Sequence, residues 1–590
     1  MKCNVLVLLG CLFFSTIVSA QAAQELSDDW NDFLHYTVIG RFDLAAGFAQ
    51  KIIDSNPDPL ELLKLSEENP RGYAILVKVH AGNPDIAPLA EKILEIIEKG
   101  RFARRTDSEI ITAEIKRLSS TVRGKYIAIE RLRNAGEHAI PYMLDAMSNQ
   151  ERKSEFPNIT TALPEVGRSA VRPLTASLVM DNLLVKSEVI KALGKIGYPE
   201  ALGYLKYIVE KDSSAQLRQL ASESINQIDS SASDKTAAEL FCRNAENYYY
   251  KAESLSPTSD MNFANVWFWD KASARLIREQ VSKAYFNELM TMRNCEWSLR
   301  ADPDFGEAIS LWIAAFFRAQ NAGIAWPKYF GTGHPNAMTY ATTAGAEYLH
   351  STLGRAVKDK DAAVALGVVE ALGRSAGEKS LMYRLKTSQP LIDALTFDDR
   401  AVRFSAAIAI ALAGPTEQFN QSVLVVNNLA EAISAPADVN SWPKDTADTY
   451  AIRACDAMFR LAETRNKVID LSTALPSLVS AAADARNEIK IFSAQILAYL
   501  SSPDAQRAIA DMAIKEDAEV YVRIAAFDSL AVSAKVNGNL LLDEQINQIY
   551  AVVQSTTVDT ELRSSAAAAF GSLNLPSRKV KDLILYQSKT

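Results

Sequence analysis

A nine-residue spacing pattern recurs along the chain and limits its fold more than any other feature. Each copy starts with an aliphatic residue, usually followed by Lys or Arg. A small or β-branched residue follows at the fourth offset, usually a small one at the seventh, and a large apolar one at the eighth. The clearest copies span residues 185–193, 217–225, 402–410, 522–530 and 562–570. These offsets share one face of a helix, so the pattern predicts a series of helices that pack through that face.

Each copy also carries signals for the ends of its helix. An aspartate precedes the pattern by a few residues and is expected to cap the helix N-terminus, an effect of about 1 kcal/mol. These aspartates are Asp181, Asp212, Asp361, Asp399, Asp484, Asp517 and Asp559. Copies with one deviation each lie at 364–372 and 489–497, and weaker copies begin at Glu155 and Tyr450. Gly373 marks a helix end. Pro199 and Pro503 then begin the next helix. The repeating unit is therefore predicted to be a helical hairpin.

The blocks VKSEVIKALGKIGYPEALGYL and VRFSAAIAIALAG resemble HEAT repeats, including the phycobilisome-lyase-like HEAT repeats. The resemblance covers roughly residues 120–230 and 350–580. It implies an all-α fold, namely an α-solenoid of the HEAT/armadillo-like superhelix type. Such solenoids are used for protein–protein contact, and the resemblance implies no catalytic chemistry. The length agrees with this, because 590 residues exceed one ordinary core, whereas stacked repeats grow without a central core.

Five segments are expected along the chain. They are a signal peptide at 1–22, a helical N-terminal cap at 23–120, HEAT-like repeats at 121–234, an aromatic-rich helical insert at 235–345 and further HEAT-like repeats at 346–590. The insert should contain a long helix near 276–299, and its stretch WSLRADPDFGEAISLW resembles a tetratricopeptide junction between two helices. The whole chain is similar to exported bacterial HEAT-repeat proteins of unassigned function, a resemblance that implies no functional residues.

The N-terminus resembles a processing signal. Lys2 precedes an apolar run at 5–18, which is shorter than the roughly 20 residues of a transmembrane helix, and small residues at Ala20 and Ala22 suit signal peptidase. We therefore expect a periplasmic or secreted protein. A lipoprotein acylated at Cys11 is the less favoured alternative, because the apolar run continues past that residue. No later stretch of the sequence reaches transmembrane length.

The net charge bears on which classes of partner can bind, and the cysteine spacing bears on disulfide bonding. The formal net charge is -8, and an acidic chain without a basic stripe is a poor candidate for nucleic-acid binding. After the leader, Cys242, Cys295 and Cys455 remain without CxxC spacing. A Cys242–Cys295 disulfide is possible for an exported protein, whereas three buried thiols are the favoured interpretation.

No catalytic centre can be assembled from the sequence. The GxSxG match at 373–377 follows a repeat helix, so Ser375 lacks the strand-to-helix turn that a nucleophile elbow requires. The five histidines have no metal-ligand spacing, and His334 in a loop is the one with the best chance of meeting a partner. We therefore expect no catalytic residues, no metal and no cofactor.

Two residue sets are candidates for contacts. The aromatic set of the insert either anchors that insert or forms a partner-binding platform, since Tyr and Trp dominate binding hot spots. Its members are Tyr248, Tyr249, Tyr250, Trp267, Phe268 and Trp269. The basic residues that follow the first position of the pattern are expected to form a structural ladder that pairs with aspartates of neighbouring turns. Its arginines are Arg218, Arg403, Arg523 and Arg563.

The sequence thus predicts a non-enzymatic scaffold of the cell envelope or periplasm. Its partner would be an unknown protein or peptide bound on the concave solenoid face. Two alternatives remain: an enzyme, or an enzyme accessory, with its site in the 235–345 insert, and a structural component of the envelope.

Overall fold

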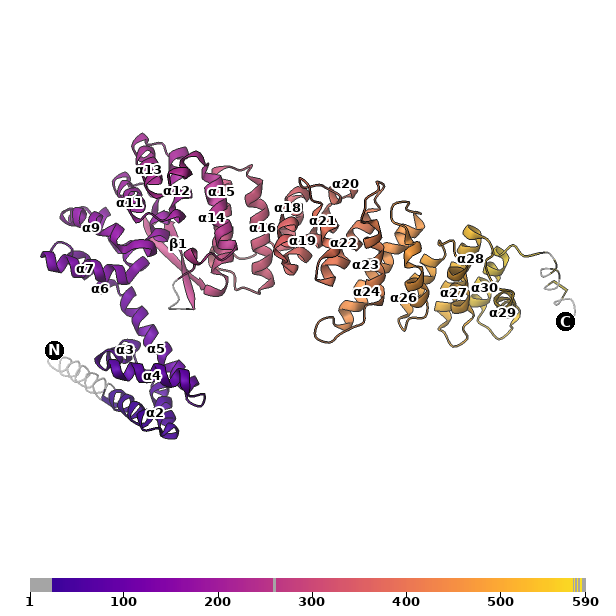
Figure 1. Ribbon diagram of the computed structural model, residues 1–590, viewed down its shortest axis with the longest axis horizontal. Helices are drawn as coiled ribbons and strands as arrows, with labels where there is room; N and C mark the ends of the chain where they lie inside the picture. The colour runs from indigo at the N-terminus through magenta and orange to yellow at the C-terminus, as the bar shows by residue number, and fades with distance from the viewer. Residues whose placement is uncertain (1–23, 258–261, 577, 579–580, 582–583, 586–590) are drawn as a thin grey trace, which may run out of the picture. The chain divides into compact units, whose positions relative to one another are not determined.

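The computed structural model describes residues 24–257, 262–576, 578, 581, 584 and 585, so the expected signal peptide and Cys11 lie outside the described residues. The described chain is helical almost throughout and divides into two compact units (Figure 1). Unit 1 holds the described residues up to Pro303 together with Trp326–Phe330. Unit 2 holds Asp304–Ala325 and the chain from Gly331 onward.

Unit 1 begins with a helical bundle around its own apolar core. Its helices include α2 (Phe42–Asp54), α3 (Pro59–Glu68), α4 (Pro70–Gly82) and α5 (Ala87–Thr106). Trp30, Phe33 and Ile52 are almost completely buried in this core. Helices α3 and α5 approach closely at Gly100, where a Cβ atom would lie 2.1 Å from the carbonyl oxygen of Pro59.

Stacked helical hairpins form the rest of unit 1. The helices are α6 (Ser108–Arg117), α7 (Val122–Ala135), α8 (Ala139–Ser148), α9 (Phe156–Ala162), α10 (Val171–Ser177), α11 (Leu183–Ile196), α12 (Leu202–Lys211), α13 (Ala215–Ile228), α14 (Ala237–Tyr249) and α15 (Phe286–Ala301). Helix α11 packs on α13, and α12 packs on α14. The Ser224 hydroxyl, at the seventh offset of its pattern, donates to the carbonyl of Ile190 in the preceding repeat at 3.1 Å. Small residues at that offset therefore bring neighbouring repeats together, as the pattern predicts.

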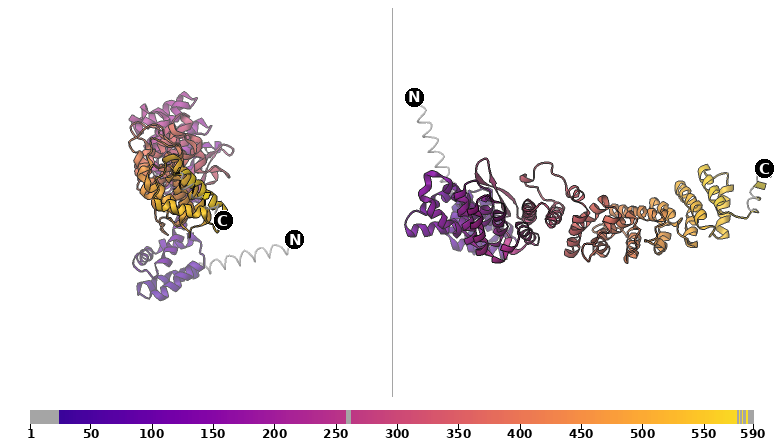
Figure 2. Two further views of the ribbon diagram at one scale, coloured as in Figure 1. Left: turned by 90° about the vertical axis from the view of Figure 1, so that its right-hand side faces the viewer. Right: turned by 90° about the horizontal axis from the view of Figure 1, so that it is seen from above.

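Unit 2 continues the same architecture. Its helices are α16 (Gly306–Asn321), α17 (Ala337–Ala344), α18 (Ala346–Asp359), α19 (Ala362–Ser375), α20 (Glu378–Leu381), α21 (Pro390–Asp393), α22 (Arg400–Ala413), α23 (Ser422–Ser434), α24 (Lys444–Glu463), α25 (Leu475–Ala481), α26 (Asn487–Leu497), α27 (Pro503–Ile514), α28 (Val520–Asn537), α29 (Asp543–Gln554) and α30 (Thr560–Ser572). Helices α19, α22, α24, α26, α28 and α30 contact one another in succession and form one layer. Helices α23, α25, α27 and α29 form the other, and Figure 2 shows these pairs side by side. The all-α solenoid is confirmed.

The residues that cap the helix N-termini agree only in part with the aspartates predicted from the sequence. Asp361, Asp399 and Asp559 accept hydrogen bonds from the first turns of α19, α22 and α30, as expected. Helices α11 and α13 are capped instead by Asn182 and Ser214.

The expectation of a wholly helical insert is wrong in one place. Strands β1 (Phe263–Asp270) and β2 (Arg275–Ser282) form an antiparallel hairpin in which Trp267 pairs with Arg278. The long helix expected near 276–299 therefore begins only at Phe286. Aromatic and β-branched residues are enriched along β1, and such residues favour a pleated, half-buried strand over a helix. The hairpin packs against α10 and α8 and forms a wall of the site described below.

Candidate anion-binding cavity

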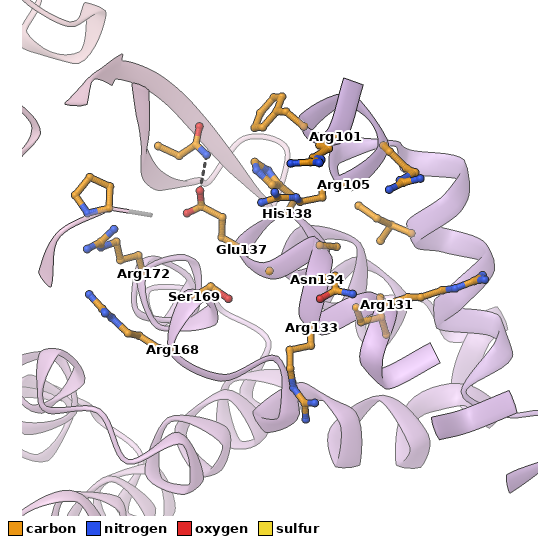
Figure 3. A pocket seen from close by; sticks show the side chains of 18 of the residues that line it. Arg101, Arg105, Arg131, Arg133, Asn134, Glu137, His138, Arg168, Ser169 and Arg172 are labelled. Carbon is orange, nitrogen blue, oxygen red and sulfur yellow. Dashed lines mark hydrogen bonds between the residues drawn. The ribbon is translucent and has the colours of Figure 1, made fainter. Parts of the chain in front are cut away.

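A cavity of about 1070 Å³ opens in unit 1 where the ends of several helices meet the hairpin (Figure 3). The C-terminal part of α5 and helix α6 form one side. The end of α7 and the short 3₁₀ segments η1 (Gly136–His138) and η3 (Leu163–Ala170) form another, and β1 completes the wall. Gly136 and Gly167 have φ values of +60° and +78°, which let the chain turn sharply at the cavity edge. A volume of this size accommodates a ligand considerably larger than a single inorganic ion.

Positive side chains dominate the lining. Seven arginines and three glutamates line it, and glutamates outside the lining pair with three of the arginines, namely Arg101, Arg104 and Arg133. The arginines are Arg101, Arg104, Arg105, Arg131, Arg133, Arg168 and Arg172, and the glutamates are Glu114, Glu137 and Glu200. A concave surface lined by one sign of charge focuses the electrostatic field and attracts ions of the opposite sign. The cavity is therefore suited to an anionic ligand.

Several of these arginines form ion pairs at the protein surface. Arg104 donates to both carboxylate oxygens of Glu67, at 2.8 and 2.7 Å. Arg131 and Arg117 share the single carboxylate of Glu114. The Arg104–Glu67 pair is exposed and contributes about 0–1 kcal/mol, so an incoming carboxylate can compete with it. The Glu114 carboxylate, in contrast, is buried.

Arg168 is exposed and has a neutral hydrogen-bond acceptor. Its Nη2 atom donates to the carbonyl oxygen of Ser256 at 3.2 Å, and its guanidinium lies 5.2 Å from the centre of the Tyr198 ring. Among the described residues, no carboxylate lies within ion-pair distance of Arg168. The Arg168 guanidinium is thus held in position by a neutral acceptor, and its positive charge is not balanced by a carboxylate of the described residues. It can therefore pair with an anionic ligand.

Arg172 forms the floor of the cavity. Its Nε atom lies 3.3 Å from Glu200 Oε1 and 3.3 Å from Tyr248 Oη, and its Nη2 atom donates to the carbonyl of Leu255. Burial alone would lower the pKa of Arg172, but the Tyr248 and Glu200 side chains outweigh it and raise that pKa. The guanidinium therefore stays charged at every physiological pH.

Glu137 fastens the hairpin to the repeats. Its two carboxylate oxygens accept from Asn265 Nδ2 at 2.5 Å and from Trp267 Nε1 at 2.7 Å. His138 lies beside it, with its ring edge-on to Phe102 at 5.2 Å and its Nδ1 atom next to the Arg278 guanidinium. Burial, together with the positive charge of Arg278, lowers the pKa of His138 to about 3.

The structure does not bring the six aromatic residues of the insert together on one exposed face. Tyr248, Tyr249 and Trp267 are buried, whereas Tyr250 is 51% exposed. Phe268 lies between the Arg293 guanidinium, 4.1 Å from its ring centre, and Tyr329, 5.0 Å away. Trp269 is half-buried on the same strand. Trp267 anchors the hairpin through Glu137.

The four arginines of the expected ladder contact main-chain carbonyls instead of aspartate carboxylates. Arg218, Arg403, Arg523 and Arg563 donate to carbonyls of Asp212, Phe397, Ala513 and Ser555 at 2.8, 3.2, 3.0 and 3.4 Å. Each guanidinium therefore ties the first turn of its helix to the segment before it, and Arg403 also pairs with the carboxylate of Glu431 at 2.8 Å. The expected pairing with aspartate occurs at the same position of another copy, between Lys186 and Asp212 at 2.6 Å.

The other sequence motifs contribute no chemistry. Ser375 is the last residue of α19, and its hydroxyl donates to the carbonyl of Ala371 within that helix, so it forms no nucleophile elbow. Cys242, Cys295 and Cys455 are buried, and burial raises the pKa of Cys455 to about 12. His334 Nδ1 lies 2.9 Å from the carbonyl of Pro335.

The described residues contain neither a metal-binding cluster nor a membrane-spanning helix. Across the described ranges, no three His, Cys, Asp or Glu side chains gather closely enough to hold a metal ion. No described helix combines the length and apolar character that crossing a bilayer requires.

The sequence analysis missed the cavity because its charges are dispersed along the chain. They come from residues 101–105, 131–133 and 168–172, which form no basic run. One signal was available: the segments GEHAIPYMLDAM and GRSAVRPLTASL match as successive copies of the turn that begins α8 and α10. Side chains at matching turns lie on the same edge of a stack, which places Glu137 and Arg168 on one rim.

Comparisons with known proteins assign no family. Neither a family model nor a curated protein matches the sequence. Among solved structures, one of tubulin recruitment by microtubule polymerases with tumour overexpressed gene domain arrays is 12% identical, with 84% of this chain and 99% of that chain covered and a TM-score of 0.25. A structure of importin beta is 12% identical, with 93% and 71% covered and a TM-score of 0.28. One on the interaction between cadherin and beta-catenin is 12% identical, with 90% and 96% covered and a TM-score of 0.25. At these values the likeness identifies neither family nor partner.

Proposed function

We propose that this chain is a non-enzymatic scaffold that captures an acidic segment of a protein partner in the arginine-lined cavity. The observation that carries the proposal is a cavity of about 1070 Å³ lined by seven arginines, among which Arg168 has only a neutral main-chain acceptor and a tyrosine ring as described neighbours. Arginine suits this role because its planar guanidinium binds carboxylates through two parallel hydrogen bonds.

A protein segment fits the cavity better than a nucleic acid does. Three glutamates line the wall and would repel the closely spaced phosphates of a polynucleotide. The cavity arginines Arg168 and Arg172 already hydrogen-bond to main-chain carbonyls, which every peptide offers. A peptide with spaced carboxylates therefore uses both kinds of contact.

Replacing Arg168 by glutamine is expected to weaken binding of a glutamate-rich peptide about tenfold. One charge-assisted hydrogen bond contributes roughly 1.5 kcal/mol, and a tenfold change in affinity corresponds to about 1.4 kcal/mol. Fluorescence anisotropy of a labelled peptide of ten residues, titrated with the full chain at low and at physiological salt, measures the effect. Affinity should also fall as salt rises.

The matched control is Arg460→Gln. Arg460 is an exposed arginine of α24 that pairs with Asp456 and does not line the cavity, so its replacement should leave peptide affinity unchanged. Equal loss in both variants would reveal general electrostatic attraction and refute the cavity as the site. Tighter binding of a single-stranded oligonucleotide than of the peptide would instead assign the cavity to nucleic acid.

The proposal includes export of the chain to the periplasm or the medium, which is supported by the leader-like residues 1–22. We expect the mature chain to begin near Gln21 or Ala23. Terminal sequencing of the protein from a cell-envelope fraction tests this, and a mature chain that keeps Lys2 would refute it. Partner binding along the concave face stays a prediction from the sequence.

A further inference from the structure

A short turn of the chain itself lies against two of the cavity arginines. The Tyr198 hydroxyl donates to the carbonyl of Ser254, Arg172 donates to that of Leu255, and Arg168 donates to that of Ser256. Residues 254–257, here called the strap, thus present three successive carbonyls to donors from two neighbouring repeats. Ser256 and Pro257 of the strap line the cavity.

The strap joins a helical turn to one extended residue. Ser254 and Leu255 belong to the 3₁₀ segment η6 (Glu253–Leu255), and Ser256 after them has φ −60° and ψ 140°, the polyproline II region. The carbonyls of these three residues accept hydrogen bonds from the donors of the cavity wall. The contacts of Tyr198, Arg172 and Arg168 therefore show that this wall can hold three successive main-chain carbonyls.

We infer that the cavity binds its partner as an acidic peptide whose main-chain carbonyls take the place of those of the strap. This inference rests on the proposed function and specifies its ligand. Arg168 now donates to a neutral carbonyl, and a guanidinium forms a stronger hydrogen bond with a carboxylate. A peptide that offers both main-chain carbonyls and a carboxylate gains contacts that the strap cannot make.

One apolar anchor holds the strap in place. The Leu255 side chain is only 4% exposed, and it must leave its pocket when the strap is displaced. A protein whose binding-competent state is a minor population binds its ligand more weakly by that fraction. Loosening the anchor should therefore increase the affinity for the peptide, the opposite of what loss of a ligand contact does.

The test uses Leu255→Ala in the full chain, with the labelled glutamate-rich peptide as probe. We expect about tenfold tighter binding than in the wild type. In the wild-type protein, hydrogen exchange of the amides at 254–256 should accelerate when the peptide is added. The control is Leu183→Ala, since Leu183 is 59% exposed on α11 and outside the cavity, and its affinity should equal that of the wild type.

The outcomes separate this inference from the proposed function. Unchanged or weaker binding by Leu255→Ala, or strap amides that exchange no faster with peptide, would overturn the inference and leave the proposed function standing if Arg168→Gln still weakens binding. The exchange measurement needs only the wild-type chain, so it decides the matter even if the variant does not fold. Equal affinity for citrate and for the peptide would also overturn it, because a small tricarboxylate has no main chain. Failure of the peptide to bind any of these proteins overturns both.

Discussion

Replacing Glu137 by alanine is expected to destabilise the hairpin and the cavity wall by about 3–5 kcal/mol. The carboxylate accepts from Asn265 Nδ2 and Trp267 Nε1, two donors on β1 whose side chains are each at most 4% exposed. A buried donor that loses its acceptor costs about 1–3 kcal/mol, and the variant creates two of them. It also removes a negative charge that attracts the guanidinium groups of Arg172 and Arg278.

Hydrogen exchange of peptides that cover β1 and β2 measures the effect locally. Amides of the hairpin should exchange much faster in Glu137→Ala, whereas those of α28 in unit 2 should not change. The control is Glu130→Ala, because Glu130 forms an exposed pair with Arg133 one turn away and has no contact with the hairpin. Equal protection of the hairpin in both variants would show that Glu137 does not hold it.

Glu137→Gln gives a graded version of the same experiment. The amide keeps one oxygen as acceptor but points an NH₂ group at the second donor, so one of the two hydrogen bonds is lost. We expect its effect to lie between those of the wild type and Glu137→Ala.

The repeat architecture was predictable because its information is local. The first residues of the pattern, such as Val402 and Val522, are completely buried at the repeat interfaces, and the residues that follow them are small enough for close packing. The hairpin was missed because the segment 263–282 is flanked by helices and contains no Gly or Pro to mark its turn; the chain instead turns through Ala274 with φ +51°.

The cavity depends on interactions that no local pattern contains. Glu137 and Trp267 are separated by 130 positions, and Arg168 and Ser256 by 88. The interpretation of the insert's aromatic residues as a binding platform depended on their residue types alone. Trp267 is buried and holds a strand, whereas Tyr250 is exposed, so residue type alone does not decide between anchoring and partner binding.

Acidification should destabilise unit 1 through His138, and this is the second large effect that we expect. In the folded chain, burial and the Arg278 charge keep His138 neutral until the pH nears 3. In the unfolded chain, a histidine takes up a proton near pH 6.5. Between these values the unfolded state binds more protons, so the free energy of unfolding decreases as the pH falls. The stabilisation is complete above pH 6.5, and at pH 5 the loss from this residue is about 2 kcal/mol.

The variant His138→Gln isolates this contribution, since glutamine keeps an acceptor near Arg278 and does not titrate. Hydrogen exchange of cavity-wall peptides at pH 7.5 and pH 5, corrected for the intrinsic rate at each pH, gives the difference in opening free energy. Burial also lowers the pKa of His350 in unit 2, so α18 should lose stability in both proteins alike. As a control, replacing the exposed His35 by glutamine should not change the difference in opening free energy between pH 7.5 and pH 5 that the wild type shows at the cavity. If His138→Gln loses as much stability at the cavity as the wild type does, the neutral imidazole is not what limits unit 1 in acid.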